Sequence, residues 1–361
     1  MPLDPFFTER LRVHRRYLLG RALTGLRTRI AALWSFGRKP EAPLAPAAAA
    51  STVPARSGAG PRARARAKHR KAARAWDRTE LETVGAPGPD LRTAEHEVPV
   101  PGYPSVRVRV YYPPDAADGP VPACLTFFGG AFRIGGIDYP TTDAACRRRA
   151  ADSGVAVVAV DYALAPEHRF PTPVEQAYAA LEWLFATAGE LDVDADRIGV
   201  AGTSAGGNIA AALTLVNRDR GRLPLRLQIL EVPVLDLTGR HLELSATRAL
   251  GIPSFIALRE LRSVVRTYLT TRAEARSAYA SPLRASSLEG LPPAVILTAQ
   301  YDPLRGDGAA YFAALRRAGV EASAVQYLGV THDTPIFTGA LPAARRWHAD
   351  VVTALRRLHE P

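Results

Sequence analysis

The sequence predicts an α/β fold in which a mostly parallel sheet carries helices on both faces. Short apolar runs alternate along the chain with segments of helical periodicity, the pattern that buried parallel strands and their crossover helices produce. Apolar residues make up 47% of the 361 residues and charged residues 22%, so a large core can form and general disorder is excluded. No stretch of about 18 uncharged apolar residues occurs, which argues against a membrane-spanning helix.

The net charge of +11 comes from the N-terminal segment. Residues 1–75 contain 17 Lys and Arg against 3 Asp and Glu, whereas the remaining residues contain 29 against 32. Binding of a specific nucleic acid is therefore not expected. Within residues 1–39, Leu and Ile recur every three or four positions, which predicts a basic amphipathic helix over residues 6–36.

Two interpretations of this helix stay open. The preferred one is a helix that packs on the protein's own core with solvated arginines. The other is a cap, or a weak contact with an anionic membrane surface. Arg15 and Arg16 faintly resemble a twin-arginine export signal, but further arginines interrupt the following stretch, so a cytoplasmic location is expected.

Residues 40–75 are rich in Pro and Ala, then in Arg, Lys and Ala. Because they offer few large apolar residues, they are predicted to form a low-complexity linker, with a helix starting near Ala73. The main domain is expected to span residues 76–361.

Each element of that domain has its own signal. Valines alternate with Arg and Tyr in the first strand, which indicates one exposed face, and later strands are continuous apolar runs. Strands are predicted at Val106–Tyr111, Ala123–Phe128, Gly154–Val160, Arg197–Ala201, Leu225–Leu230, Ala294–Ala299 and Ala322–Leu328. Helices are predicted at Pro173–Ala188, Ala205–Val216, Ala309–Ala318 and Ala343–Leu358. Ligands of such sheets bind beyond the carboxyl ends of the strands, so the residues that follow each strand are candidates for the site.

The sequence Gly202-Thr203-Ser204-Ala205-Gly206 fits the pattern G-x-S-x-G between a predicted strand and a predicted helix. In this context the pattern indicates a nucleophile elbow, where a sharp turn strains the serine and requires small neighbours two residues away. The alternative is an ordinary glycine-rich turn, which this context disfavours. Ser204 is therefore the candidate nucleophile.

A nucleophilic serine needs a base and an acid that orients the base, and in this arrangement the chain order is Ser, acid, His. His332 directly follows a predicted strand and is the expected base. Asp302 follows the preceding strand and is the expected acid, whereas Asp307 is explained more simply as a helix N-cap. The other histidines after Ser204 lie in polar segments: His241, His348 and His359.

Several short segments fit the pattern of one known family: Asp161–His168 (DYALAPEH), Ser204–Asn208 (SAGGN), Pro233–Asp236, Ser281–Leu283 and Tyr301–Arg305. Through them, residues 96–361 resemble the hormone-sensitive-lipase-like (family IV) carboxylesterases of the α/β-hydrolase fold. The resemblance implies a carboxylesterase or lipase-like serine hydrolase that forms an acyl-enzyme with Ser204, His332 and Asp302. It also implies no cofactor, a small-molecule ester substrate, and a helical cap built from the N-terminal segment and an insertion at about residues 238–275.

The sequence departs from the family pattern around the oxyanion site. The family's H-G-G-G reads Phe128-Gly129-Gly130-Ala131, and Thr203 replaces the aspartate of its G-D-S-A-G. The expected oxyanion donors are main-chain N–H groups, those of Gly129, Gly130 and Ala205, so they survive. Loss of a histidine and an aspartate predicts weaker polar support of this loop and lower activity. A weakly active or non-catalytic ligand-binding protein of the same fold is therefore the alternative.

Other candidates are less specific. Phe132, Tyr162 and Phe337 flank the catalytic loops and either line the substrate pocket or belong to the core. Cys124 and Cys146 are expected to be buried and unpaired. No Cys/His cluster predicts a metal site, and a homodimer stays open.

Overall fold

The computed structural model describes residues 1–13, 61–114 and 119–360. The chain divides into two compact units, one of residues 2–69 and one of residues 70–361. Residues 5–13 of the first unit are helical, and most of the helix predicted over residues 6–36 lies outside the described residues. None of the described helices combines the length and apolar character that a membrane span requires.

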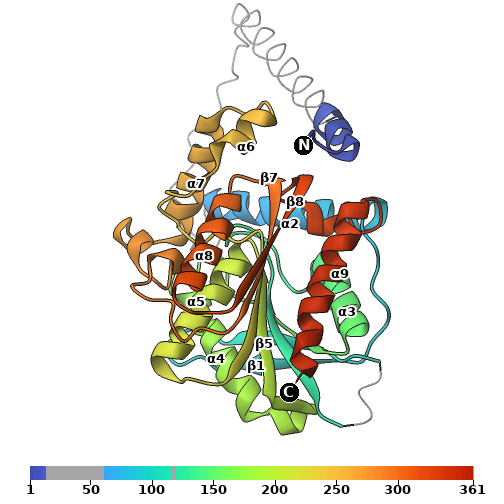
Figure 1. Ribbon diagram of the computed structural model, residues 1–361, viewed down its shortest axis with the longest axis vertical. Helices are drawn as coiled ribbons and strands as arrows, with labels where there is room; N and C mark the ends of the chain where they lie inside the picture. Colours follow the sequence, from blue (N-terminus) through green and yellow to red (C-terminus); the bar gives the residue numbers. More distant parts are fainter. Residues whose placement is uncertain (14–60, 115–118, 361) are drawn as a thin grey trace, which may run out of the picture. The chain divides into compact units, whose positions relative to one another are not determined.

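The second unit is built on one mostly parallel sheet (Figure 1). The strand order is β1-β2-β4-β3-β5-β6-β7-β8, in which β2 pairs antiparallel with β1 and β4 and the remaining neighbours are parallel. The strands are β1 Thr93–Val98, β2 Val106–Tyr111, β3 Val121–Phe127, β4 Ala156–Val160, β5 Val193–Thr203, β6 Leu225–Glu231, β7 Ala294–Tyr301 and β8 Ala322–Thr331. The predicted α/β sheet is confirmed.

Helices cover both faces of this sheet (Figure 1). Helices α3 and α9 pack together on one face, and α4, α5 and α8 lie on the other. The helix bounds are α2 Pro61–Thr83, α3 Pro140–Ser153, α4 Thr172–Ala186, α5 Ala205–Arg220, α6 Leu244–Ala249, α7 Ser254–Tyr268, α8 Arg305–Arg317 and α9 Pro342–Arg356. The segment of residues 238–275, expected as a cap insertion, contains α6 and α7.

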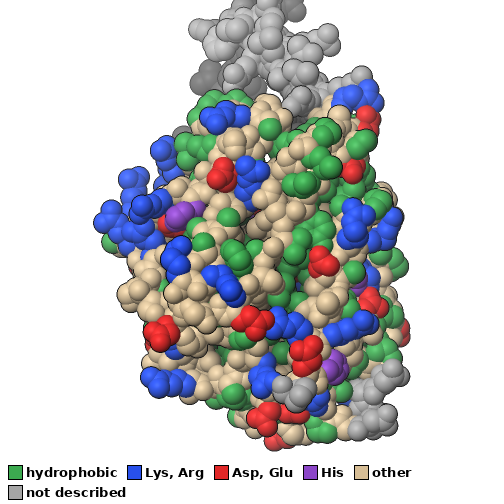
Figure 2. Space-filling view, in the orientation of Figure 1, with side chains coloured by type: hydrophobic (Ala, Val, Ile, Leu, Met, Phe, Trp, Pro, Cys, Tyr) green, Lys and Arg blue, Asp and Glu red, His purple; other side chains and the backbone are tan. Residues whose placement is uncertain are grey.

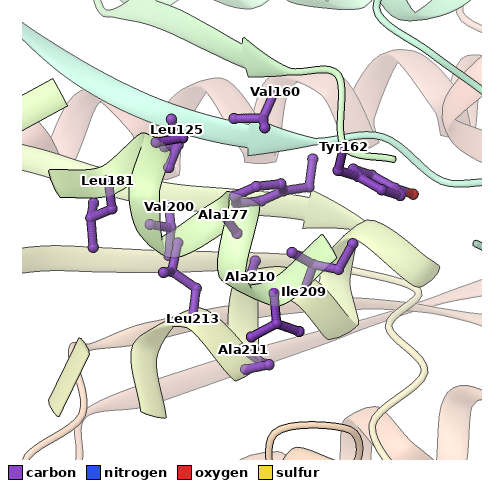
Figure 3. Close-up of a cluster of buried hydrophobic side chains, with 14 of the residues drawn as sticks. Leu125, Val160, Tyr162, Ala177, Leu181, Val200, Ile209, Ala210, Ala211 and Leu213 are labelled. Carbon is purple, nitrogen blue, oxygen red and sulfur yellow. The ribbon is translucent and has the colours of Figure 1, made fainter. Parts of the chain in front are cut away.

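Helix α5 is the most deeply buried helix of the unit. Every residue from Ala205 to Asn217 is buried, because the sheet covers one side of the helix and α4 the other. Figure 3 shows Ile209, Ala210 and Leu213 of α5 among side chains of the neighbouring strands and of α4. The alanines let the helix approach the sheet closely, and the larger side chains fill the remaining space. This packing fixes the position of the first turn of α5, directly after Ser204.

Helix α2 begins at Pro61, so the prediction of a linker through residue 75 is wrong for residues 61–75. The physical reason is helix propensity. This stretch alternates Ala with Arg and Lys, which are strong helix formers, and Pro61 occupies the first turn, where proline is tolerated. The rest of that segment lies outside the described residues.

A buried carboxylate joins α2 to α3. Asp77 of α2 is 5% exposed and accepts hydrogen bonds from the Thr141 backbone N–H, at 3.0 Å, and from the Thr141 hydroxyl. Thr141 lies in the first turn of α3, where the N-cap residue Tyr139 makes no side-chain cap. Asp77 therefore caps α3 from another helix. Burial raises the pKa of Asp77, while the two Thr141 hydrogen bonds act in the opposite direction.

We expect Asp77→Ala to lower the free energy of unfolding by about 1–2 kcal/mol, because it leaves an N–H of the first turn of α3 without its acceptor. Urea denaturation measures the change. Glu82→Ala is the matched control, since Glu82 is an exposed carboxylate near the end of the same helix. An equal, small effect of both substitutions would contradict the capping role.

Candidate active site

Ser204 occupies a sharp turn between β5, which ends at Thr203, and α5, which begins at Ala205. Its backbone has φ 55° and ψ −113°, a conformation that non-glycine residues rarely adopt. A Cβ at Gly202 would lie 2.2 Å from the Gly206 carbonyl oxygen, and one at Gly206 would lie 2.1 Å from the Phe127 carbonyl oxygen. The turn therefore requires both glycines, as the elbow pattern predicts.

Ser204, His332 and Asp302 form one chain of hydrogen bonds. His332 Nε2 lies 3.0 Å from Ser204 Oγ, and His332 Nδ1 lies 2.7 Å from Asp302 Oδ2. Sheet register explains why Asp302 and His332 meet. Tyr301, the last residue of β7, pairs with Thr331, the last residue of β8, and Asp302 and His332 directly follow them. The structure thus brings together the three residues singled out from the sequence.

Asp302 is 1% exposed, and its other carboxylate oxygen accepts the Leu304 backbone N–H at 2.9 Å. Burial alone would lower the pKa of His332. The charge of Asp302 and its hydrogen bond outweigh burial, and with a smaller contribution from Asp333 they raise the pKa of His332 to about 9. The carboxylate therefore stabilises the protonated imidazole.

The loop after β3 brings two glycines beside Ser204. A Cβ at Gly129 would lie 3.4 Å from that of Ser204, and Gly130 has φ 143°. The backbone N–H groups of Gly129, Gly130 and Ala205 donate to no acceptor among the described residues. Ala131 follows with φ 52°, in the left-handed region that costs an L-residue about 1–2 kcal/mol. At Ala131 the loop therefore keeps a backbone conformation that favours glycine, although the residue is alanine.

Comparisons with known proteins agree with this geometry. Residues 124–336 match the family model described as alpha/beta hydrolase fold. Carboxylesterase NlhH of Mycobacterium tuberculosis is 35% identical over 289 residues, which are 77% of this chain and 86% of the relative. The chain belongs to the α/β-hydrolase family.

Other relatives of this α/β-hydrolase are similar over much of their length. An ethyl acetate hydrolase of Pseudomonas putida is 34% identical, with 69% of this chain and 78% of the relative covered. The crystal structure of EstE1, a thermophilic carboxylesterase cloned from a metagenomic library, has a TM-score of 0.74 at 37% identity and covers 82% of this chain and 98% of its own. The resemblance to the hormone-sensitive-lipase-like (family IV) carboxylesterases is confirmed.

Polar support beneath the nucleophile comes from a residue outside the sequence motifs, whereas weaker polar support of the oxyanion loop and lower activity stay predictions. Glu231, at the end of β6, is fully buried and pairs in register with Thr203 of β5. Its carboxylate accepts hydrogen bonds from Thr203 Oγ1 at 3.0 Å, from Trp347 Nε1 at 2.8 Å and from Arg149 at 2.7 and 2.9 Å. Its carbonyl oxygen also accepts the Ser204 N–H at 2.8 Å. A single acidic residue at the end of an apolar strand was the only sequence signal.

Phe128 stands where the family has a histidine, and it is supported by stacking. Its ring lies 4.1 Å from that of Tyr162, with 10° between the ring planes, and the Tyr162 hydroxyl donates to the Phe128 carbonyl oxygen at 2.8 Å. Gly135 packs against the same ring, since a Cβ there would lie 2.5 Å from Phe128. Aromatic packing therefore holds this side of the loop.

A cavity of about 380 Å³ opens beside the hydrogen-bonded chain. Ser204 and His332 line it together with side chains of α2, of α3 and of the segment after His332. Trp76 and Leu81 of α2 belong to this wall. The predicted pocket residues Phe132, Tyr162 and Phe337 do not line the cavity.

Those three aromatic residues belong to the core instead, each no more than 3% exposed. Phe132 stacks on Tyr268 with ring centroids 3.7 Å apart, and Tyr162 stacks on Phe128. Proximity to the catalytic loops in sequence was compatible with a place in the pocket or in the core. For Phe132 and Tyr162, stacking partners distant in sequence hold the side chain in the core.

Asp307 is not a helix N-cap, which corrects the reading from sequence. It lies inside the first turn of α8, is fully buried, and accepts the backbone N–H groups of Leu235 and Asp236 at 2.7 and 3.0 Å. Burial raises its pKa to about 7. It therefore anchors the loop after β6 and does not contact His332.

The remaining sequence candidates have ordinary partners. His348 and His359 contact Asp152 and the Ser153 carbonyl, and His241 lies near Asp236. Cys124 and Cys146 are free and buried, and burial raises the pKa of each thiol to about 12.

Replacing Asp302 by Asn is expected to lower kcat strongly, because the amide presents the wrong partner to the imidazole; the equivalent change in a serine protease costs about 10⁴-fold. It also removes the charge that raises the pKa of His332. Since the base acts when neutral, the rising limb of kcat/KM against pH should move to lower pH. An unchanged pH profile would exclude Asp302 as the partner of His332.

Glu231→Leu is expected to destabilise the protein by about 3–5 kcal/mol, because it leaves the Arg149 guanidinium, only 13% exposed, without its carboxylate. Adding Arg149→Leu should recover the part of that loss that comes from the unpaired guanidinium, whereas the buried Trp347 N–H stays without its acceptor. Denaturation of both variants and of Arg149→Leu completes the double-mutant cycle. Additive effects would show that the two side chains do not depend on each other.

Proposed function

We propose that this α/β-hydrolase is a carboxylesterase in which Ser204 is the nucleophile, His332 the general base and Asp302 the group that orients the imidazole. The observation that carries the proposal is the hydrogen-bond chain from Asp302 through His332 to Ser204, at the wall of a cavity large enough for a small ester. The relatives named carboxylesterase and ethyl acetate hydrolase support the same activity.

In the first half-reaction His332 Nε2 accepts the proton of Ser204 Oγ as that oxygen attacks the ester carbonyl carbon. The negative charge that develops on the carbonyl oxygen is met by the N–H groups of Gly129, Gly130 and Ala205, which are free to donate. His332 then gives its proton to the departing alkoxide, and an alcohol leaves.

In the second half-reaction water attacks the acyl-enzyme with His332 again as the base. Release of the carboxylic acid restores Ser204. Asp302 stays ionised throughout and stabilises the imidazolium that forms in each half-reaction. No cofactor takes part in this proposed sequence.

The alternative of a non-catalytic ligand-binding protein is not favoured. Such a protein does not need the strained Ser204 backbone or an imidazole held at hydrogen-bond distance from the serine on one side and from a buried carboxylate on the other. The departures at Phe128 and Thr203 leave the three main-chain donors in place.

Three further expectations stay proposals. A cytoplasmic location is supported by the two unpaired buried cysteines. A homodimer is supported by the exposed apolar side chains of Val325 and Leu328 on β8, an edge strand. Weak membrane contact involves residues 6–36, of which only residues 6–13 are described.

On the face drawn in Figure 2, basic and acidic side chains are interspersed over most of the surface.

A fluorophosphonate probe should label the protein, and a panel of p-nitrophenyl esters of increasing chain length should be hydrolysed. Ser204→Ala should abolish labelling and lower kcat by about 10⁶-fold, the cost of removing the nucleophile in a serine protease. Ser286→Ala is the matched control because Ser286 is exposed and lies outside the cavity. Labelling that persists in Ser204→Ala would place the nucleophile elsewhere.

A further inference from the structure

The cavity beside Ser204 has a basic wall that the proposed chemistry does not use. Arg148 and Arg149, successive residues of α3, both line it. Much of the remaining wall is apolar, with Trp76, Ile134 and Ile336 among its residues. The cavity therefore combines the catalytic serine, an apolar lining and two guanidinium groups.

Arginine occupies three consecutive positions of α3, and two of these side chains have carboxylate partners. Arg147 pairs with Asp143 at 2.7 Å and with Asp90 at 3.3 Å, and Arg149 pairs with Glu231 at 2.7 Å. Arg147 does not line the cavity. The carboxylates that neutralise Arg147 therefore lie away from the cavity, and the carboxylate that neutralises Arg149 lies beneath the nucleophile.

Arg148 differs from both neighbours. Among the residues that the structure describes, no carboxylate forms an ion pair with it. Its guanidinium donates a hydrogen bond to the Ala86 carbonyl oxygen. Its Nε atom is buried without an acceptor. Burial, reinforced by the positive charge of Arg149, lowers the pKa of Arg148 to about 10, against a smaller opposite effect of Asp152, whose carboxylate pairs with His348. A partly buried cation without a counter-ion is unfavourable, and an anion in the cavity would relieve it.

The acidic residues of the cavity do not fill this role. The carboxylate of Asp77 accepts two hydrogen bonds from Thr141, and Asp333 lies beside His332 at the catalytic end. An external carboxylate would pair with the charge of the Arg148 guanidinium, a group suited to carboxylates. The volume of about 380 Å³ lies at the lower end of small-molecule sites, which favours a short ligand.

We propose that the cavity selects esters that carry a carboxylate, with Arg148 as the residue that recognises it. This substrate class rests on the proposed esterase function. The ester carbonyl lies at Ser204, an apolar spacer crosses the cavity, and the carboxylate reaches Arg148. Arg148 is thus a specificity-determining residue and takes no part in bond breaking.

The test compares esters that differ in this one charge. The mono-p-nitrophenyl ester of glutaric acid is paired with p-nitrophenyl valerate, and the ratio of their kcat/KM values is measured for the wild type. A second pair, 4-acetoxybenzoate and phenyl acetate, places the carboxylate on the alcohol side of the ester. Because each ratio is internal to one protein sample, it does not depend on the fraction of correctly folded enzyme.

In Arg148→Gln the charged-to-neutral ratio should fall by about tenfold or more for at least one pair, the range expected for a lost hydrogen bond to a charged group. Arg148→Lys should retain part of the preference. Arg147→Gln is the matched control and should leave both ratios unchanged. If Arg148→Gln does not fold, Arg148→Lys decides, because it keeps the charge but loses the planar guanidinium, so its charged-to-neutral ratio should still fall.

Ratios that are the same in the wild type and Arg148→Gln for both pairs would overturn the assignment of Arg148. Where Arg148→Gln does not fold, a ratio in Arg148→Lys equal to that of the wild type would do so. In either case, hydrolysis of p-nitrophenyl valerate would leave the proposed function intact. A wild type that hydrolyses none of the four esters would contradict the proposed function and, with it, the substrate class.

Discussion

The strained turn at Ser204 is the constraint on which the site depends. A residue at φ 55° and ψ −113° persists only where its surroundings hold it, and here they do so from three directions. Strand β5 is paired on both sides, α5 is buried from Ala205 to Asn217, and the Ser204 N–H donates to the Glu231 carbonyl oxygen. The large buried core of the fold thus stabilises one unfavourable backbone conformation, which exposes a single hydroxyl to its base.

Buried charged side chains lie beneath and beside that turn. Glu231 joins the ends of β5 and β6 to α3 and α9 through Thr203, Arg149 and Trp347. Such a pair is costly to bury and destabilising to break, so it ties four elements together near the nucleophile. Arg148, one residue away, has no such partner among the described residues and lines the cavity. Adjacent arginines on one helix therefore have different roles, one structural and one proposed for recognition.

Local patterns were sufficient for the catalytic residues but not for their surroundings. Ser204, Asp302 and His332 each follow a strand directly, and parallel strands bring their carboxyl ends to one edge, so sequence position alone indicated that they meet. Phe132, Tyr162 and Phe337 also lie close to these loops in sequence, yet they are buried in the core. For Phe132 the reason is its stacking partner Tyr268, which lies far along the chain. Helix α2 shows a related failure, since its start at Pro61 follows from helix propensity and not from apolar residues.

The sequence by itself determined the α/β architecture, the elbow with its two glycines and the order of nucleophile, acid and base. These features depend on short stretches of chain in which the sequence patterns of a strand, a turn and a helix follow one another. Only the tertiary structure decided which residues support the elbow, that Asp77 caps α3, that Asp307 anchors a loop, and which arginine of α3 lacks a carboxylate. Each of these depends on a contact between residues remote in sequence, and the free energy of such a contact is set by burial and geometry that exist only once the chain has folded.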